Sequence, residues 1–190
     1  MMLPAVVRVF FAVDLPATMK EKLKEFIITL KKQSMSHGIR WTKSDNLHIT
    51  LQFLAEVKTE HLPQLIDEVK NVLQGKKVHL DLTLGELRLF PSAYHPRVIV
   101  MDVTEQQALS ELSAIIGQGI QHAQYAVEEK PFRGHLTLGR IKHTGLKLDF
   151  LGEVTLPDFE GLPVDEIVLF RSEPEDHGSK YTPLEVISLG

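Results

Sequence analysis

Residues 46–54 read NLHITLQFL, and residues 131–140 read PFRGHLTLGR. The tetrapeptide His-x-Thr-Leu therefore occurs twice, at His48–Leu51 and at His135–Leu138. Roughly 0.07 such tetrapeptides are expected by chance in a chain of this composition, so two copies are a specific signal. Apolar residues alternate with the histidine and threonine in both stretches. This alternation predicts two β-strands that each present a His and a Thr on one face.

The segments that precede the two motifs follow a common plan. An apolar segment ends at Asp14, a helical pattern follows, and His48 comes 34 residues after the aspartate. In the second half an apolar segment reaches Asp102, a helical pattern follows, and His135 comes 33 residues later. This repeat predicts a pseudo-two-fold pair of sheets, each of which presents one histidine to a shared cleft.

The periodicity of the whole chain indicates the fold class. Apolar residues recur at helical spacing from Pro16, from about Thr59, and after Thr104, which we expect to cap its helix. Candidate strands are residues 8–13, 39–42, 47–54, 78–84, 97–103, 135–141, 148–154, 164–170 and 184–189. Loops are expected near residues 90–96, 145 and 174–183. Because several strands follow one another directly, we expect an α+β fold with two largely antiparallel sheets flanking a central cleft and helices on the outside. Residues 1–190 are predicted to form one bilobal catalytic domain.

The composition narrows the classes of partner. A chain of 190 residues with 43% hydrophobic and 24% charged residues is typical of globular proteins. A net charge of −4 argues against a wide non-specific nucleic-acid surface, but it is compatible with an RNA end held by a few cations. No cysteine is present, which excludes disulfides and thiolate nucleophiles and fits a cytoplasmic location. No apolar run approaches the roughly 20 residues that span a bilayer, so we expect no membrane partner.

Two histidines and two threonines suit one kind of chemistry. Opening a cyclic phosphodiester requires a base to activate water and an acid to protonate the departing oxygen, and two imidazoles can fill both roles. Each threonine hydroxyl can donate a hydrogen bond to a phosphate oxygen. Two histidines without a carboxylate or cysteine on the same faces argue against a zinc site. We therefore expect catalysis without a metal or other cofactor. The spacing does not say which histidine is the acid.

The doubled motif resembles that of the 2H phosphoesterase superfamily, and the chain is similar to its RNA 2′,3′-cyclic phosphodiesterases, also called 2′–5′ RNA ligases. The similarity covers almost the whole chain. It is carried by RVFFAVDLP at residues 8–16, Arg40-Trp41, residues 46–54 and 131–140, and YTPL at residues 181–184. The resemblance implies the 2H phosphoesterase fold. It also implies hydrolysis of a terminal 2′,3′-cyclic phosphate on RNA to a 2′-phosphate, with ATP-independent 2′–5′ ligation as the reverse.

The resemblance also implies roles for single residues. His48 would be the proton donor to the 3′ oxygen, and His135 the proton acceptor that activates water. Thr50, Thr137, Arg140 and Phe11 would bind the substrate. In an ideal strand Arg140 would point away from His135, so a bulge or the end of the strand must redirect it.

Four further residues are weaker candidates or departures. Trp41 and Tyr181 are candidates for the lining of the same cleft, and Arg133 is a candidate for contact with the RNA backbone. Gly134 stands where the family usually has a proline, which predicts a less rigid entry to the second motif.

Other readings of the same residues stay open. The site would serve 2′–5′ oligonucleotides or a small cyclic nucleotide equally well, because the cleft walls select the ligand. A non-catalytic module that binds RNA ends and a histidine-based metal protein are the alternatives from other classes. We expect the protein to act as a monomer.

Overall fold

The computed structural model describes residues 2–34 and 37–190. Within these residues it contains three α-helices and ten β-strands. In chain order they are β1 (Val6–Asp14), α1 (Ala17–Ser34), β2 (Ile39–Trp41), β3 (His48–Lys58), α2 (Leu62–Leu73), β4 (Leu80–Leu82), β5 (Leu84–Phe90), β6 (Val98–Val103), α3 (Gln106–His122), β7 (His135–Ile141), β8 (Leu162–Val164), β9 (Glu166–Glu175) and β10 (Gly178–Ser188).

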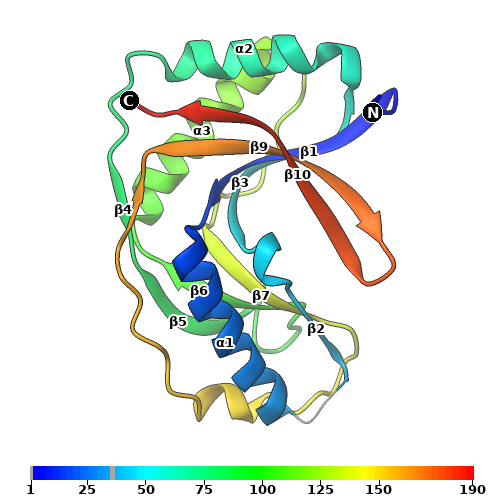
Figure 1. The fold of residues 1–190 in the computed structure, drawn as a ribbon, viewed down its shortest axis with the longest axis vertical. Helices are drawn as coiled ribbons and strands as arrows, with labels where there is room; N and C mark the ends of the chain where they lie inside the picture. The colour runs from blue at the N-terminus through cyan, green and yellow to red at the C-terminus, as the bar shows by residue number, and fades with distance from the viewer. Residues whose placement is uncertain (1, 35–36) are drawn as a thin grey trace.

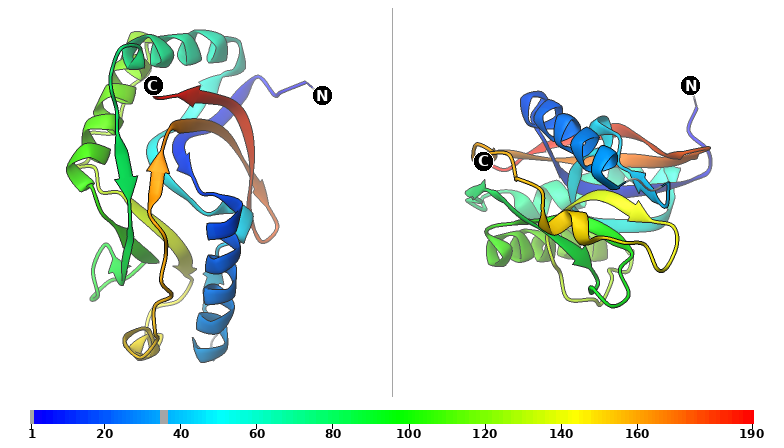
Figure 2. Two further views of the ribbon diagram at one scale, coloured as in Figure 1. Left: turned by 60° about the vertical axis from the view of Figure 1, so that its left-hand side comes forward. Right: turned by 90° about the horizontal axis from the view of Figure 1, so that it is seen from below.

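Two four-stranded sheets form the centre of the molecule (Figure 1). The strand orders are β10-β9-β1-β3 and β2-β7-β6-β5, and all neighbouring strands in both sheets pair antiparallel. Strands β4 and β8 form a separate two-stranded ribbon. Figure 2 shows α1 and α3 on opposite sides of the strands. The predicted α+β fold with two antiparallel sheets and outer helices is confirmed.

One continuous hydrophobic core joins the two sheets and the three helices. It includes Ile49 of β3 and Leu136 of β7, which are both 0% exposed. Helices α2 and α3 approach closely at Gly119, where an added Cβ would lie 2.7 Å from the Cα of Val69. Each motif strand is therefore held from behind by packed apolar side chains. Within the described residues, no helix is long and apolar enough to cross a membrane.

Several expectations for single elements are wrong. The predicted strand at residues 148–154 is instead a short 3-10 helix at Asp149–Gly152, because its apolar residues do not alternate regularly. Strand β5 was not expected. Thr104 does not cap α3: Glu105 precedes the helix with φ 57°, and the Thr104 hydroxyl accepts a hydrogen bond from the Thr83 amide.

The predicted loop at residues 174–183 is a tight hairpin between β9 and β10. Pro183 suggested a loop because proline lacks an amide donor. Strand β10 is at the edge of its sheet, and its pairing with β9 shifts register between Pro183 and Glu185. An edge strand with such an irregularity tolerates proline.

Candidate active site

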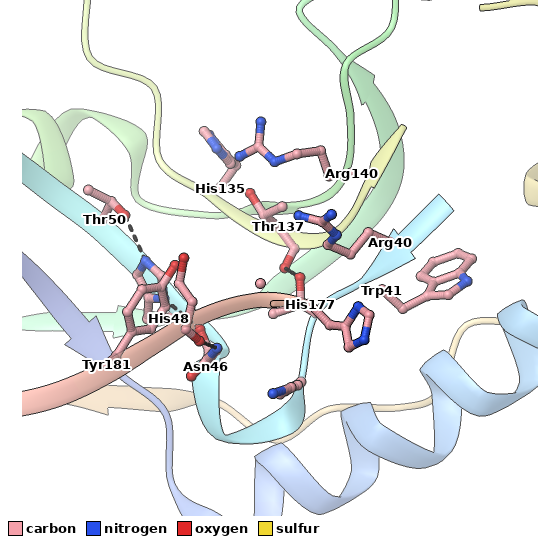
Figure 3. A pocket seen from close by; sticks show the side chains of 14 residues that line it. Arg40, Trp41, Asn46, His48, Thr50, His135, Thr137, Arg140, His177 and Tyr181 are labelled. Carbon is pink, nitrogen blue, oxygen red and sulfur yellow. Dashed lines mark hydrogen bonds between the residues drawn. The ribbon is translucent and has the colours of Figure 1, made fainter. Parts of the chain in front are cut away.

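The two motifs meet in one cleft between the sheets. Strand β3 carries His48 and Thr50, β7 carries His135 and Thr137, and all four line a cavity of about 370 Å³ (Figure 3). Its other lining residues are Arg40, Trp41, Thr42, Lys43, Asn46, Arg140, His177, Gly178, Ser179 and Tyr181. A volume of this size lies within the range of small-ligand sites. The structure thus brings together five of the six predicted site residues.

The strand pleat explains why the motif residues face the cleft. His48 and His135 are partly exposed, whereas the intervening Ile49 and Leu136 are fully buried. This confirms the predicted alternation of the two faces. The threonines share the histidine face, and the Thr50 hydroxyl lies 2.8 Å from Nε2 of His48.

Both imidazole rings are oriented in the same way. Nδ1 of His48 lies 2.6 Å from the Asn46 carbonyl oxygen, and Nδ1 of His135 lies 3.0 Å from the Arg133 carbonyl oxygen. A carbonyl only accepts hydrogen bonds, so Nδ1 carries the proton and donates it in both rings. Nε2 is then the nitrogen that gains and loses a proton in the cleft.

Both histidines are easier to deprotonate than a free imidazole. Burial lowers the pKa of His48, and Lys20 and His135 lower it further, against the Asn46 carbonyl and Asp14. Burial also lowers the pKa of His135, with the Arg133 carbonyl and Asp102 acting in the opposite direction and the Arg133 guanidinium lowering it. A neutral imidazole that accepts a proton from water is therefore available in the cleft near neutral pH.

A carboxylate lies opposite each histidine on the neighbouring strand. Asp14 pairs with His48 between β1 and β3, and Asp102 pairs with His135 between β6 and β7. Asp14 forms an ion pair with Lys20 at 2.8 Å, and Asp102 bonds Arg88. The equal Asp-to-His offset in the sequence marks these two pairs. We did not predict the aspartates as part of the site.

Arg140 reaches the cleft because β7 contains a bulge. Val100 pairs with Thr137 but Ile99 pairs with Gly139, so Leu138 is an extra residue in the ladder. The bulge reverses the face of the following residues, and Figure 3 shows the Arg140 side chain extending toward His135. The expectation that a bulge or strand end must redirect Arg140 is confirmed.

A second arginine, which we did not predict as a binding residue, lies opposite Arg140. Arg40 of β2 and Arg140 of β7 are direct cross-strand partners, and both line the cleft. Like charges in directly opposite positions are unfavourable unless an anion is bound near them. The pair therefore creates a site for an anion beside the histidines and threonines. No sequence signal connects these two residues, since their pairing depends on the tertiary fold.

Phe11 does not reach the cleft, so its predicted contact with the substrate is wrong. Its side chain is 0% exposed in the main core. Phe10, on the opposite face of β1, packs against His48 with ring centroids 4.7 Å apart. Tyr181 meets the same imidazole edge-on at 5.2 Å, and Phe90 stacks on His135 at 5.2 Å. Trp41 and Tyr181 line the cleft, as the sequence suggested.

Gly134 does not loosen the entry to β7. It is buried, and its amide donates to Oε1 of Gln106 at 2.9 Å while its carbonyl accepts from Nε2 of Gln106 at 2.8 Å. A proline here would lose the first of these bonds. Gly134 therefore fixes the backbone immediately before His135.

Comparison with known proteins identifies the family. Residues 13–100 match the family described as LigT like Phosphoesterase. The RNA 2′,3′-cyclic phosphodiesterase of Methanothermobacter thermautotrophicus is 27% identical over 96% of this chain and 99% of its own length. The RNA 2′,3′-cyclic phosphodiesterase of Archaeoglobus fulgidus is 29% identical over 94% of this chain and 98% of its own length. The crystal structure of TT0787 of Thermus thermophilus superposes with a TM-score of 0.76 at 27% identity, covering 96% of this chain and 97% of that one. With both motifs in one cleft of this fold, the chain belongs to the LigT-like phosphoesterases of the 2H superfamily.

Proposed function

We propose that this protein hydrolyses the 2′,3′-cyclic phosphate at an RNA end to a 2′-phosphate by acid–base catalysis with His48 and His135. The observation that carries the proposal is the arrangement of two imidazoles with fixed Nδ1 protons beside the Arg40–Arg140 anion site. Relatives that bear this activity in their names match over nearly their full length, which supports the substrate class.

The proposed reaction transfers one proton at each end of the phosphorus. Neutral His135 accepts a proton from water at Nε2 while the water oxygen forms a bond to phosphorus. The bond between phosphorus and the 3′ oxygen breaks, and protonated His48 donates its Nε2 proton to that oxygen. The assignment of His48 as the acid and His135 as the base rests on the family resemblance. Both histidines then exchange protons with solvent before the next turnover.

The other cleft residues stabilise the charge on the phosphate. We propose that the Thr50 and Thr137 hydroxyls donate hydrogen bonds to its non-bridging oxygens. Arg140, with Arg40 opposite it, supplies positive charge that strengthens as negative charge develops on these oxygens. The bound phosphate in turn stabilises protonated His48, which offsets the effect of burial on its pKa.

The proposal requires no metal and no second copy of the chain. Within the described residues, no group of three His, Asp or Glu side chains is arranged to hold a metal ion. Both motifs come from a single chain, which supports action as a monomer. The cytoplasmic location expected from the cysteine-free sequence is part of the same proposal.

The test is hydrolysis of a short RNA ending in a 2′,3′-cyclic phosphate, assayed in EDTA with separation of the 2′- and 3′-phosphate products. We expect a 2′-phosphate end and no change on chelation. A 3′-phosphate product would contradict the proposed departure of the 3′ oxygen. Binding of the RNA end without turnover would instead indicate a recognition module, and turnover only in the absence of EDTA would indicate a metal enzyme.

A further inference from the structure

A second cavity of about 510 Å³ opens from the active-site cleft on its far side. It shares Thr50 and His135 with the cleft, so the two cavities meet where the reacting phosphate is proposed to lie. We call it the aromatic groove and define it by six of its lining residues. They are Phe53, Phe90, Gln118, Lys130, Phe132 and Arg133.

The internal repeat relates this groove to the cleft. Strand β3 has the same bulge as β7, because Phe11 pairs with Gln52 but Ala12 pairs with Thr50, which leaves Leu51 as the extra residue. Phe53 follows Leu51 by two positions, as Arg140 follows Leu138. The groove therefore has a phenyl ring at the position where the cleft has its arginine.

The aromatic rings of the groove differ in how they are used. Phe90 stacks on His135 at 5.2 Å, and the Arg133 guanidinium lies 5.7 Å from the Phe90 ring. Phe53 is 38% exposed, with the Arg8 guanidinium 5.8 Å from its ring. Phe132 is partly buried. Phe53 thus offers an accessible aromatic face next to the reacting centre.

The charged and amide groups of the groove favour an anionic ligand with polar edges. Lys130 and Arg133 give two cations against the single carboxylate of Glu128, although the whole chain has a net charge of −4. Gln118 and Gln121 add amide donors and acceptors. Bases of single-stranded RNA stack on aromatic side chains, their edges bond amides, and their phosphates contact Lys and Arg.

From these observations, and on the basis of the proposed function, we propose that the aromatic groove binds the nucleotide that precedes the reacting end of the RNA. Its base stacks on Phe53, and the phosphate that links it to the terminal nucleotide lies near Lys130 and Arg133. The enzyme then prefers an oligonucleotide end to a free cyclic mononucleotide, because only the oligonucleotide fills both cavities.

The test compares kcat/KM for adenosine 2′,3′-cyclic phosphate and for the dinucleotide ApA ending in a 2′,3′-cyclic phosphate. We expect the wild-type ratio to favour the dinucleotide by about tenfold or more, as one stacked base would give. Phe53→Leu and Lys130→Ala should each lower this ratio at least about threefold, and the effect of Lys130→Ala should shrink at high salt. Tyr94→Leu and Lys32→Ala, exposed residues outside both cavities, are the matched controls and should leave the ratio unchanged. Because both substrates are measured on one preparation, partial unfolding of a variant does not alter the ratio.

A wild-type ratio near one, or a ratio unaffected by both groove variants, overturns the proposal while leaving the hydrolase function intact. Stimulation only by a separate RNA with a 5′-hydroxyl end also overturns it, because the groove would then hold a different RNA strand. If neither substrate is hydrolysed, the proposed function fails. The groove is then judged by the Kd values of the mononucleotide and dinucleotide 2′-phosphates, for which the same tenfold preference and the same variant effects are expected.

Discussion

Replacing Arg140 with methionine should reduce catalysis without reducing stability. Methionine keeps much of the length of the side chain and removes only its charge and its donors. A hydrogen bond to a charged group contributes about 1.5–3 kcal/mol. At 1.36 kcal/mol per factor of ten, this predicts a loss of roughly 10- to 150-fold in kcat/KM.

The stability of this variant should change in the opposite direction. Arg40 and Arg140 are exposed cross-strand partners of like charge, and such pairs are unfavourable by roughly 0.2–1 kcal/mol. Removing one charge should leave the free energy of unfolding unchanged or raise it by up to about 1 kcal/mol. Inorganic phosphate should raise the Tm of the wild type and raise that of Arg140→Met less, because ligand stabilisation follows affinity.

The assay combines kcat/KM on the cyclic-phosphate RNA with urea unfolding and with thermal unfolding in the presence and absence of phosphate. Arg97→Met, an exposed arginine outside the cleft, is the matched control and should leave all three readouts unchanged. The reasoning is refuted if Arg140→Met retains full activity, or if it loses more than about 1 kcal/mol of stability. The second outcome would mean that Arg140 is part of the scaffold and not of an anion site.

Three further predictions follow from the same geometry. Because burial lowers the pKa of both histidines, the pH dependence of kcat/KM should be bell-shaped with its maximum below about pH 6.5, and a maximum above pH 7.5 would contradict it. With folded pKa values below the unfolded value, the unfolded state binds more protons as the pH falls through 6.5. The free energy of unfolding should therefore be lower at pH 5.5 than at pH 7.5, and His48→Gln should reduce that difference in urea titrations. Phe11→Leu should lose about 1 kcal/mol of stability with kcat/KM within twofold of wild type, whereas Phe10→Leu should lower kcat/KM about tenfold by freeing the His48 ring; equal activities would show that Phe10 does not position His48. Gly134→Pro should destabilise the protein by about 1–2 kcal/mol in the same titrations through loss of the amide bond to Gln106, and an unchanged stability would indicate that this bond contributes nothing.

The alternation in the two motifs was sufficient to predict how the histidines and threonines are presented. A strand with one face on the core and one on a cleft shows its orientation in the sequence, since apolar and polar residues alternate. Strand β1 gives no such signal. It lies between β9 and β3, and its run of apolar residues is buried on both faces, with Phe11 in the main core and Phe10 in a smaller cluster. This is why the sequence could not distinguish Phe10 from Phe11.

Contacts that depend on register between distant strands were also beyond the sequence. Arg40 and Arg140 are 100 positions apart, and their pairing depends on the bulge at Leu138, which neither Leu138 nor Gly139 signals. The equal spacing from Asp14 to His48 and from Asp102 to His135 did carry information. It marked two cross-strand pairs before their contacts could be known.

The most direct test of the two-histidine mechanism is the rate at which His48→Ala, His135→Ala and the double variant hydrolyse the cyclic-phosphate RNA in EDTA. We predict that each single variant loses at least about 100-fold in kcat and that the double variant is little slower than the slower single, because the two residues act as a unit. His79→Ala, an exposed histidine outside the cleft, should stay within twofold of wild type. If either single variant retains more than about a tenth of the wild-type rate, that histidine is neither the acid nor the base, and the proposed mechanism is wrong.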